Sequence, residues 1–197
     1  MLNISNEDYH SRDGISSSAV KSVFKKSLAH WKGEKRNANN AAFAMGNAVH
    51  ANLLEKDRNL VIKGPKTKTS VAFKDMKEKL TRPDLMIEAE GTVYDVKTTQ
   101  DASPRGFLNE CVKYGYFLQG AHYVYTCKLA GFDVSKFSFI ACEKSAPFLS
   151  HLHLMGEEVM TWANIELHKT LAVIARAEKD VDYGTGWGDY TVMETGS

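Results

Sequence analysis

Three charged side chains near the middle of the sequence, Asp84, Asp95 and Lys97, are of the types that a hydrolytic site needs. Carboxylate oxygens are hard ligands that suit Mg²⁺ or Mn²⁺, and such ions can activate a water molecule and stabilise charge on a phosphate. A lysine beside the second carboxylate could orient that water or stabilise the transition state. The plain alternative is a surface salt bridge between Asp95 and Lys97, which would contribute little. The metal site is favoured because the segment is otherwise apolar and should be half-buried.

Two short β-prone segments, 83–88 and 92–98, carry these residues, and a glycine-containing turn separates them. This pattern predicts a β-hairpin. Because side chains alternate between the two faces of a strand, Asp95 and Lys97 share one face of the second segment. Asp84 stands near the start of the first segment, so all three charged groups can converge on one face of a sheet.

Helical spacing of apolar residues dominates the rest of the sequence. A serine-capped amphipathic helix is expected after Ser16, and its lysines give this end of the chain a local positive character. The other expected elements are a buried helix at 41–54 that contains His50, a polar connection at 63–79, a long helix at 103–130 that contains Gln119 and Tyr123, a central strand at 137–142, a second long helix at 155–177 and an irregular tail from residue 180. This order predicts an α/β (α+β) fold in which helices flank a small mixed central sheet.

Length and composition limit how the chain is organised. A chain of 197 residues can bury one core, so we expect a single domain over residues 1–197, with N-terminal helices at about 16–55 and a catalytic core at about 82–178. The net charge of +1 gives no whole-surface attraction to nucleic acid and leaves only local contacts. The three cysteines lack paired spacing and are expected to be buried thiols of a reducing compartment. No apolar run is long enough to span a bilayer and no signal-peptide pattern is present, so a cytoplasmic protein without membrane contact is expected.

Longer motifs surround the charged residues. RPD at 82–84 followed by YDVKTT at 94–99 resembles the signature of the PD-(D/E)XK nucleases. GNAVH, which ends at His50, resembles the helix motif in which RecB-type and RecE-type nucleases place a metal-binding histidine, and Gln119 with Tyr123 fits their QxxxY pattern. The segments 4–10, 14–16 and 155–158 are similar to the exonuclease domain of exodeoxyribonuclease VIII (RecE) and its phage relatives. A lone DxK is a weak signal, but these motifs in this order are a strong one.

The resemblance implies a restriction-endonuclease-like core and a metal-dependent 5′-to-3′ exonuclease that acts on the ends of linear double-stranded DNA. It also implies a ring-shaped homo-oligomer around the DNA. The 3′ single strand left by such an enzyme would pass to a recombinase or a single-strand annealing protein. A phage or prophage origin would agree with this activity.

The same resemblance implies roles for individual residues. His50, Asp84 and Asp95 would bind Mg²⁺ or Mn²⁺, with the backbone carbonyl of Val96 as a further ligand. Lys97 would serve the attacking water, and Gln119 and Tyr123 would support the site or contact DNA. Ser18 and Arg82 are candidates for phosphate contacts, because a helix N-terminus and a guanidinium group both bind anions.

One part of the sequence departs from the resemblance. The family usually has another strand, often with an acidic residue, before the RPD motif, whereas this chain offers at most a short strand at 70–73. Glu78 and Glu88 are the nearby acids, and neither is favoured as a ligand. Either the protein is naturally shorter at this point, or the printed sequence omits residues that the protein carries there, and the second alternative is favoured. Without that strand the sheet edge beside Asp84 would be unpaired.

Two other functions stay open at this point. One is a different PD-(D/E)XK nuclease, such as a RecB-type or Cas4-like endonuclease or a DNA-repair nuclease. An iron–sulfur version would need four suitably placed cysteines, and this chain has three. The other is a catalytically impaired DNA-binding protein on the same fold. The intact Asp84, Asp95 and Lys97 argue against that second alternative, and the shortened segment argues for it.

Overall fold

The computed structural model describes residues 14–33 and 83–184, and these contain a four-stranded mixed sheet. The strands are β1 (Leu85–Ile87), β2 (Thr92–Thr99), β3 (Lys136–Glu143) and β4 (Ser150–Leu154), in the spatial order β1-β2-β3-β4. β2 pairs in antiparallel fashion with β1 and in parallel with β3, and β4 returns antiparallel to β3. The predicted hairpin and the inner position of the strand at 137–142 are confirmed. The fourth strand was not predicted from the sequence.

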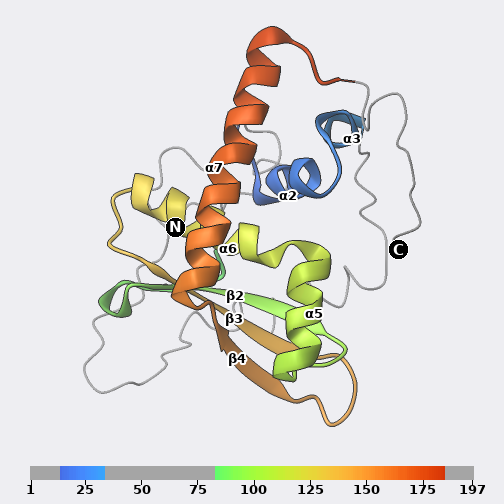
Figure 1. Cartoon of the computed structure of the whole chain (residues 1–197). Coiled ribbons are helices and arrows are strands. Elements are labelled where there is room, and N and C mark those ends of the chain that lie inside the picture. The colour runs from blue at the N-terminus through green and yellow to red at the C-terminus, as the bar shows by residue number, and fades with distance from the viewer. Residues whose placement is uncertain (1–13, 34–82, 185–197) are drawn as a thin grey trace, which may run out of the picture.

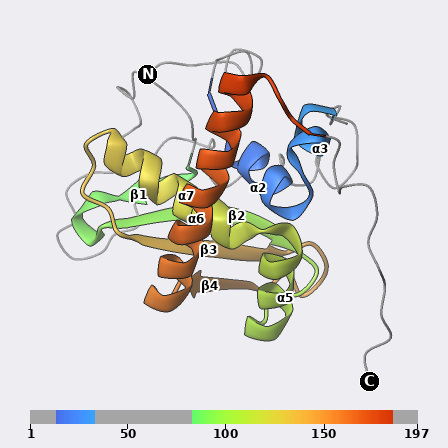
Figure 2. The same cartoon turned by 45° about the horizontal axis from the view of Figure 1, so that its top comes forward.

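Five α-helices accompany this sheet in the described part of the chain: α2 (Ser17–Lys25), α3 (Leu28–Gly33), α5 (Pro104–Tyr114), α6 (Tyr116–Leu129) and α7 (Glu157–Asp180). A 3₁₀ turn, η2 (Glu88–Glu90), closes the hairpin. Figure 1 shows α5 and α6 as the connection between the parallel strands β2 and β3. In Figure 2, α2, α6 and α7 lie on the same side of the sheet. The expected α/β (α+β) fold, a small mixed sheet flanked by helices, is therefore confirmed.

The expectation of one long helix at 103–130 is wrong. The chain forms two helices there, because Gly115 adopts a left-handed backbone conformation with φ of 67°. Such a residue ends a helix by capping its last carbonyl groups, and glycine adopts the conformation without a Cβ penalty. The break gives α6 a direction of its own across the sheet (Figure 1).

The serine-capped helix near the N-terminus is confirmed. The Ser16 hydroxyl accepts a hydrogen bond from the backbone N–H of Ala19, and α2 begins at the next residue, Ser17. Ser103 caps α5 in the same way, with Pro104 in the first helical position. Both caps satisfy N–H groups that a helix start leaves without partners.

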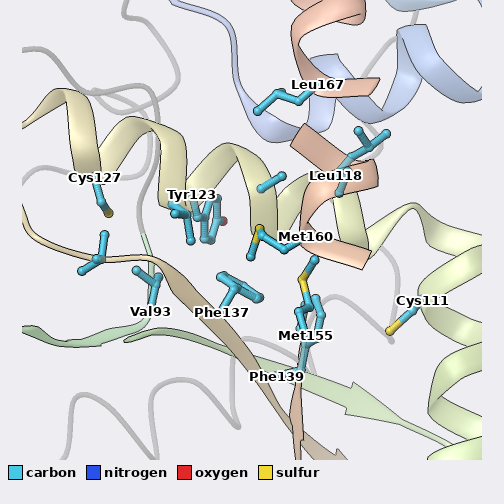
Figure 3. Packing of buried hydrophobic residues seen from close by; sticks show 14 of the residues in the cluster. Val93, Cys111, Leu118, Tyr123, Cys127, Phe137, Phe139, Met155, Met160 and Leu167 are labelled. Carbon is cyan, nitrogen blue, oxygen red and sulfur yellow. The ribbon is translucent and has the colours of Figure 1, made fainter. Parts of the chain in front are cut away.

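The core lies between the sheet and the helices that cover it (Figure 3). Phe137 and Phe139 of β3 are fully buried, and Leu118 of α6 and Leu167 of α7 pack into the same cluster. Gly120 lets α6 approach the sheet closely, because a Cβ there would stand 2.5 Å from the Met155 sulfur. Aromatic side chains of this size supply much of the apolar area that a small domain can bury.

The cysteines of this core are free thiols, with Cys111 and Cys127 buried and Cys142 half-buried. The second long helix, expected at 155–177, is confirmed as α7. The predicted helix at 41–54, the connection at 63–79 and the questioned strand before residue 82 lie outside the described residues, as does most of the tail. The single domain over the whole chain stays a prediction. No helix of the described segments is both long and apolar enough to cross a membrane.

Candidate active site

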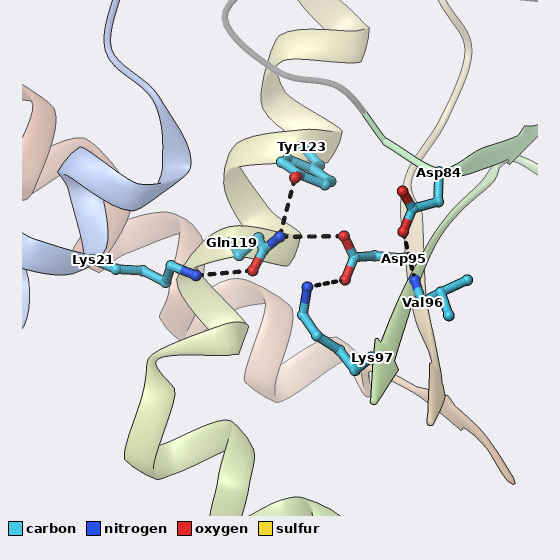
Figure 4. Close-up of polar contacts among 7 residues, drawn as sticks. All are labelled: Lys21, Asp84, Asp95, Val96, Lys97, Gln119 and Tyr123. Atoms are coloured by element: carbon cyan, nitrogen blue, oxygen red, sulfur yellow. Dashed lines mark hydrogen bonds and ion pairs between the residues drawn. The ribbon is translucent and has the colours of Figure 1, made fainter. Parts of the chain in front are cut away.

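Hairpin pairing brings the two aspartates together. Leu85 pairs with Tyr94 and Met86 with Val93, so continuing the antiparallel register by one residue sets Asp84 opposite Asp95. The backbone N–H of Val96 donates a hydrogen bond of 2.7 Å to Asp84 Oδ2. Figure 4 shows the two carboxylates side by side at the end of the hairpin. The pairing register of β1 and β2 therefore places the Asp84 and Asp95 carboxylates next to each other.

Asp95 is held from two directions. It is 3% exposed. The Lys97 ammonium forms an ion pair with Oδ2, and Gln119 Nε2 donates a hydrogen bond of 3.2 Å to Oδ1. Burial raises the pKa of the Asp95 carboxyl, the charge of Lys97 opposes this rise, and the negative charge of Asp84 adds to it. A half-buried carboxylate beside a fully buried one produces a site that a cation would stabilise.

Gln119 and Tyr123 lie one turn apart on α6 and face the sheet. Gln119 Nε2 donates a second hydrogen bond, of 3.0 Å, to the Tyr123 hydroxyl oxygen. On its other side the amide oxygen of Gln119 accepts a hydrogen bond of 3.0 Å from Lys21 Nζ of α2 (Figure 4). The QxxxY pair of the sequence prediction thus lies in the polar cluster around Asp95.

Two residues of this cluster were missed in the sequence. Lys21 belongs to α2, 98 residues away from its partner Gln119, and no local spacing relates the two. Tyr116 starts α6, and the ammonium groups of Lys97 and Lys21 lie 5.0 Å and 5.4 Å from its ring centroid. These distances permit cation–π attraction. The only sequence signal for Lys21 was its place in a capped helix with basic character.

The structure thus brings together six predicted residues, namely Asp84, Asp95, Val96, Lys97, Gln119 and Tyr123. Ser18 lies exposed in the first turn of α2. The predicted metal ligand His50 and the predicted phosphate contact Arg82 lie outside the described residues. Glu88, an acid near the hairpin, is exposed in η2.

The donor set fits a hard divalent cation. Asp84 and Asp95 supply carboxylate oxygens, and their mutual repulsion is what a bound cation would relieve. Within residues 14–33 and 83–184 no three His, Cys, Asp or Glu side chains form a group that could hold a metal ion. A full coordination shell would therefore need other ligands, for which the Val96 carbonyl, His50 and water are the candidates.

Comparison with known proteins agrees with this geometry. A crystal structure of a candidate exonuclease from Eubacterium rectale is similar to the chain, with a TM-score of 0.62 at 13% sequence identity. The alignment covers 100% of this chain and 97% of that one, so the two share a fold. No curated protein matches the sequence. The sequence model of a PDDEXK-like domain of unknown function (DUF3799) matches residues 54–184, which include the hairpin, α6 and α7. The chain therefore belongs to this PDDEXK-like family, the superfamily that its RPD and DVK motifs resemble.

Proposed function

We propose that the protein is a Mg²⁺- or Mn²⁺-dependent deoxyribonuclease that hydrolyses phosphodiester bonds. The observation that carries this proposal is the cluster of the buried Asp95 with the half-buried Asp84 and Lys97 on one face of the hairpin. A structural salt bridge alone would explain the pair of Asp95 and Lys97. It would not explain a second carboxylate directly beside a buried one, because that placement costs stability unless a cation offsets it.

Each residue of the cluster has a role in this proposal. Asp84 and Asp95 would hold the cation, with the Val96 carbonyl and His50 as further ligands. Such a cation, when bound, lowers the pKa of a water molecule and offsets charge on the phosphate. Lys97 orients the attacking water and stabilises the charge that develops on the phosphate oxygens. Gln119 holds Asp95 through Oδ1, and the other carboxylate oxygen, Oδ2, faces Lys97.

The more specific proposal is a 5′-to-3′ exonuclease on linear double-stranded DNA. It is supported by the resemblance of the sequence to RecE-like exonucleases and by the shared fold with the Eubacterium rectale protein, which is described as a candidate exonuclease. The resulting 3′ single strands would serve recombination, with a recombinase or a single-strand annealing protein as partner.

A ring-shaped homo-oligomer belongs to the same proposal. The chain has a net charge of +1, so a single copy gains little from long-range attraction to DNA. Several copies around one duplex would add their weak local contacts, because every contact after the first is intramolecular. Sedimentation of the purified protein would show a closed oligomer, whereas a monomer at every concentration would contradict this part of the proposal.

The test uses linear duplex DNA labelled separately at its 5′ and 3′ ends, with closed circular DNA as a second substrate. In Mg²⁺ we expect early release of the 5′ label, slow loss of the 3′ label and no attack on the circle. EDTA should abolish the reaction. Nicking of the circle would instead indicate a RecB-type or Cas4-like endonuclease. Binding of DNA without cleavage would indicate a DNA-binding protein that has lost its chemistry.

A further inference from the structure

The side-chain amide of Gln119 lies at the centre of the polar cluster and contacts three different groups. Its nitrogen is 3.2 Å from Asp95 Oδ1 and 3.0 Å from the Tyr123 hydroxyl oxygen, and its oxygen is 3.0 Å from Lys21 Nζ (Figure 4). The two ends of an amide are not equivalent, since the NH₂ group only donates hydrogen bonds and the oxygen only accepts them. The orientation of this amide therefore decides whether Asp95 receives a donor.

A lysine ammonium can donate hydrogen bonds but cannot accept them. Lys21 therefore binds the oxygen end of the amide and directs the NH₂ end toward Asp95. If the amide turned over, its oxygen would face the Asp95 carboxylate, and two acceptors would meet in a buried position. Tyr123 cannot prevent this reversal, because a hydroxyl group can donate to an oxygen as readily as it accepts from an NH₂ group.

We propose that Lys21 is a positioning residue, which fixes the Gln119 amide in the orientation that donates to Asp95. This proposal rests on the function proposed above only in so far as Asp95 acts in catalysis. The residue reaches the site from α2, an element that otherwise contributes apolar side chains to the core. It links the N-terminal helix to the catalytic hairpin through one hydrogen-bond chain.

The surroundings of Lys21 argue against a role in packing alone. The pKa of Lys21 is lowered to about 8 because burial and, to a smaller extent, the charge of Lys97 disfavour the ammonium form, while the charge of Asp95 partly opposes them. An apolar side chain of similar length would fill the same space without bringing a second ammonium group close to Lys97. The contacts that offset this cost are the Gln119 oxygen and the Tyr116 ring.

Lys25 provides a matched control on the same helix. It lies one turn after Lys21, and its ammonium group donates to the backbone carbonyls of Val112, at 3.1 Å, and Lys113. Lys25 thus fastens α2 to the end of α5 without contacting Gln119. Replacing either lysine by methionine removes one charge from α2 together with the contacts that the ammonium group makes. Only the Lys21 variant removes the contact with the amide.

NMR measures the side-chain amide signal of Gln119 directly. The chain contains only two glutamines, Gln100 and Gln119, so glutamine-specific ¹⁵N labelling gives two side-chain NH₂ signals. Gln100 is exposed, and a Gln100→Asn variant assigns the pair. We expect Lys21→Met to shift or broaden the Gln119 signal and Lys21→Arg to restore it. Lys25→Met should leave it unchanged. If Lys21→Met does not fold, Lys21→Ser, which admits water, replaces it.

Kinetics provide the second readout. Loss of a residue that orients a site ligand lowers activity by about 10- to 100-fold. We expect a loss of this size in kcat for Lys21→Met, with KM for DNA little changed, recovery in Lys21→Arg and no loss in Lys25→Met. A rise in KM alone would make Lys21 a DNA contact and overturn the proposal. An unchanged Gln119 signal in Lys21→Met would also overturn it. If the unaltered protein cleaves no DNA, the proposed nuclease function fails, and the NMR comparison still tests Lys21.

Discussion

Asp84 and Asp95 owe their proximity to a single register of the β1–β2 hairpin. The Asp84 carboxylate accepts a hydrogen bond from the backbone N–H of Val96, and the side-chain oxygen of an asparagine could accept the same bond. Asparagine at this position therefore changes the charge of the site while keeping the main hydrogen bond of the hairpin.

We predict that Asp84→Asn weakens binding of Mn²⁺ by about 10-fold or more, because a neutral amide is a poorer ligand for a hard cation. Calorimetric titration of the metal without DNA measures this affinity. Glu90→Gln is the control, since Glu90 is exposed beyond β1. A side-chain oxygen of either glutamate or glutamine can accept the hydrogen bond from the Tyr94 hydroxyl. Equal Mn²⁺ affinity in Asp84→Asn and the unaltered protein would contradict the assignment of Asp84 as a ligand.

His122 is a second buried polar residue on α6, but it lies outside the polar cluster. It is 1% exposed, and burial lowers its pKa from 6.5 to about 4. The unfolded chain binds a proton at this side chain as the pH falls through 6.5, whereas the folded chain resists protonation until about pH 4. Acidification across this window therefore favours unfolding.

We predict that the unaltered protein loses roughly 1–2 kcal/mol more stability between pH 7 and pH 5 than His122→Leu does. Urea unfolding at the two pH values measures the difference. The comparison between the two proteins cancels the contributions of other titrating groups, including that of Asp95. Parallel pH dependence in both proteins would show that His122 is protonated as readily in the folded chain as in the unfolded one.

At the residue scale the sequence was informative where spacing within one element determines the geometry. Asp95 and Lys97 lie two residues apart on one strand and therefore share a face, and Gln119 and Tyr123 lie one helical turn apart. The pairing of the side chains within each element therefore follows from local periodicity. Lys21 and Tyr116 could not be predicted in the same way. Their positions depend on how α2 packs against α6, which is a matter of tertiary structure.

At the scale of elements, the α5–α6 break shows what periodicity alone misses. Apolar residues, Val112 and Leu129 among them, recur through 103–130 with helical spacing, which predicts one continuous helix. Both are exposed, since the left-handed Gly115 divides the segment into two helices, and each helix buries its own set of residues. β4 was missed for another reason. Its sequence, SHLHL, is only five residues long and contains no β-branched residue, and most of its side chains are exposed.

The close approach of α6 to β3 at Gly120 yields a prediction at this scale. A Cβ at Gly120 would stand 2.5 Å from Met155 Sδ and 2.8 Å from Phe137 Cδ1, so Gly120→Ala must displace these two side chains or the helix itself. We expect a loss of about 1–3 kcal/mol in the free energy of unfolding, as for other overpacked cores. Urea unfolding measures it. Gly33→Ala, where an added Cβ meets nothing within 4 Å, should show no such loss. Equal stability of both variants would mean that α6 packs less tightly than described.

At the scale of the whole molecule, the parallel pairing of β2 with β3 organises the site. The crossover through α5 and α6 returns the chain to the sheet beside β2, and it lays Gln119 over the face that carries Asp95. The order of elements in the sequence was enough to predict this α/β arrangement. The hairpin, the inner strand and the PD-(D/E)XK-like motifs were all recognisable because each depends on a contiguous segment.

The proposed function assigns metal-dependent hydrolysis of DNA to the cluster of Asp84, Asp95 and Lys97. The most direct test is the initial rate at which linear duplex DNA is degraded in Mg²⁺ by the unaltered protein, by Lys97→Ala and by Lys136→Ala. Lys136 is the matched control, an exposed lysine at the start of β3. We predict that Lys97→Ala lowers the rate by about 10²-fold or more and that Lys136→Ala leaves it unchanged. Degradation by Lys97→Ala at the rate of the unaltered protein would mean that this cluster does not catalyse the hydrolysis.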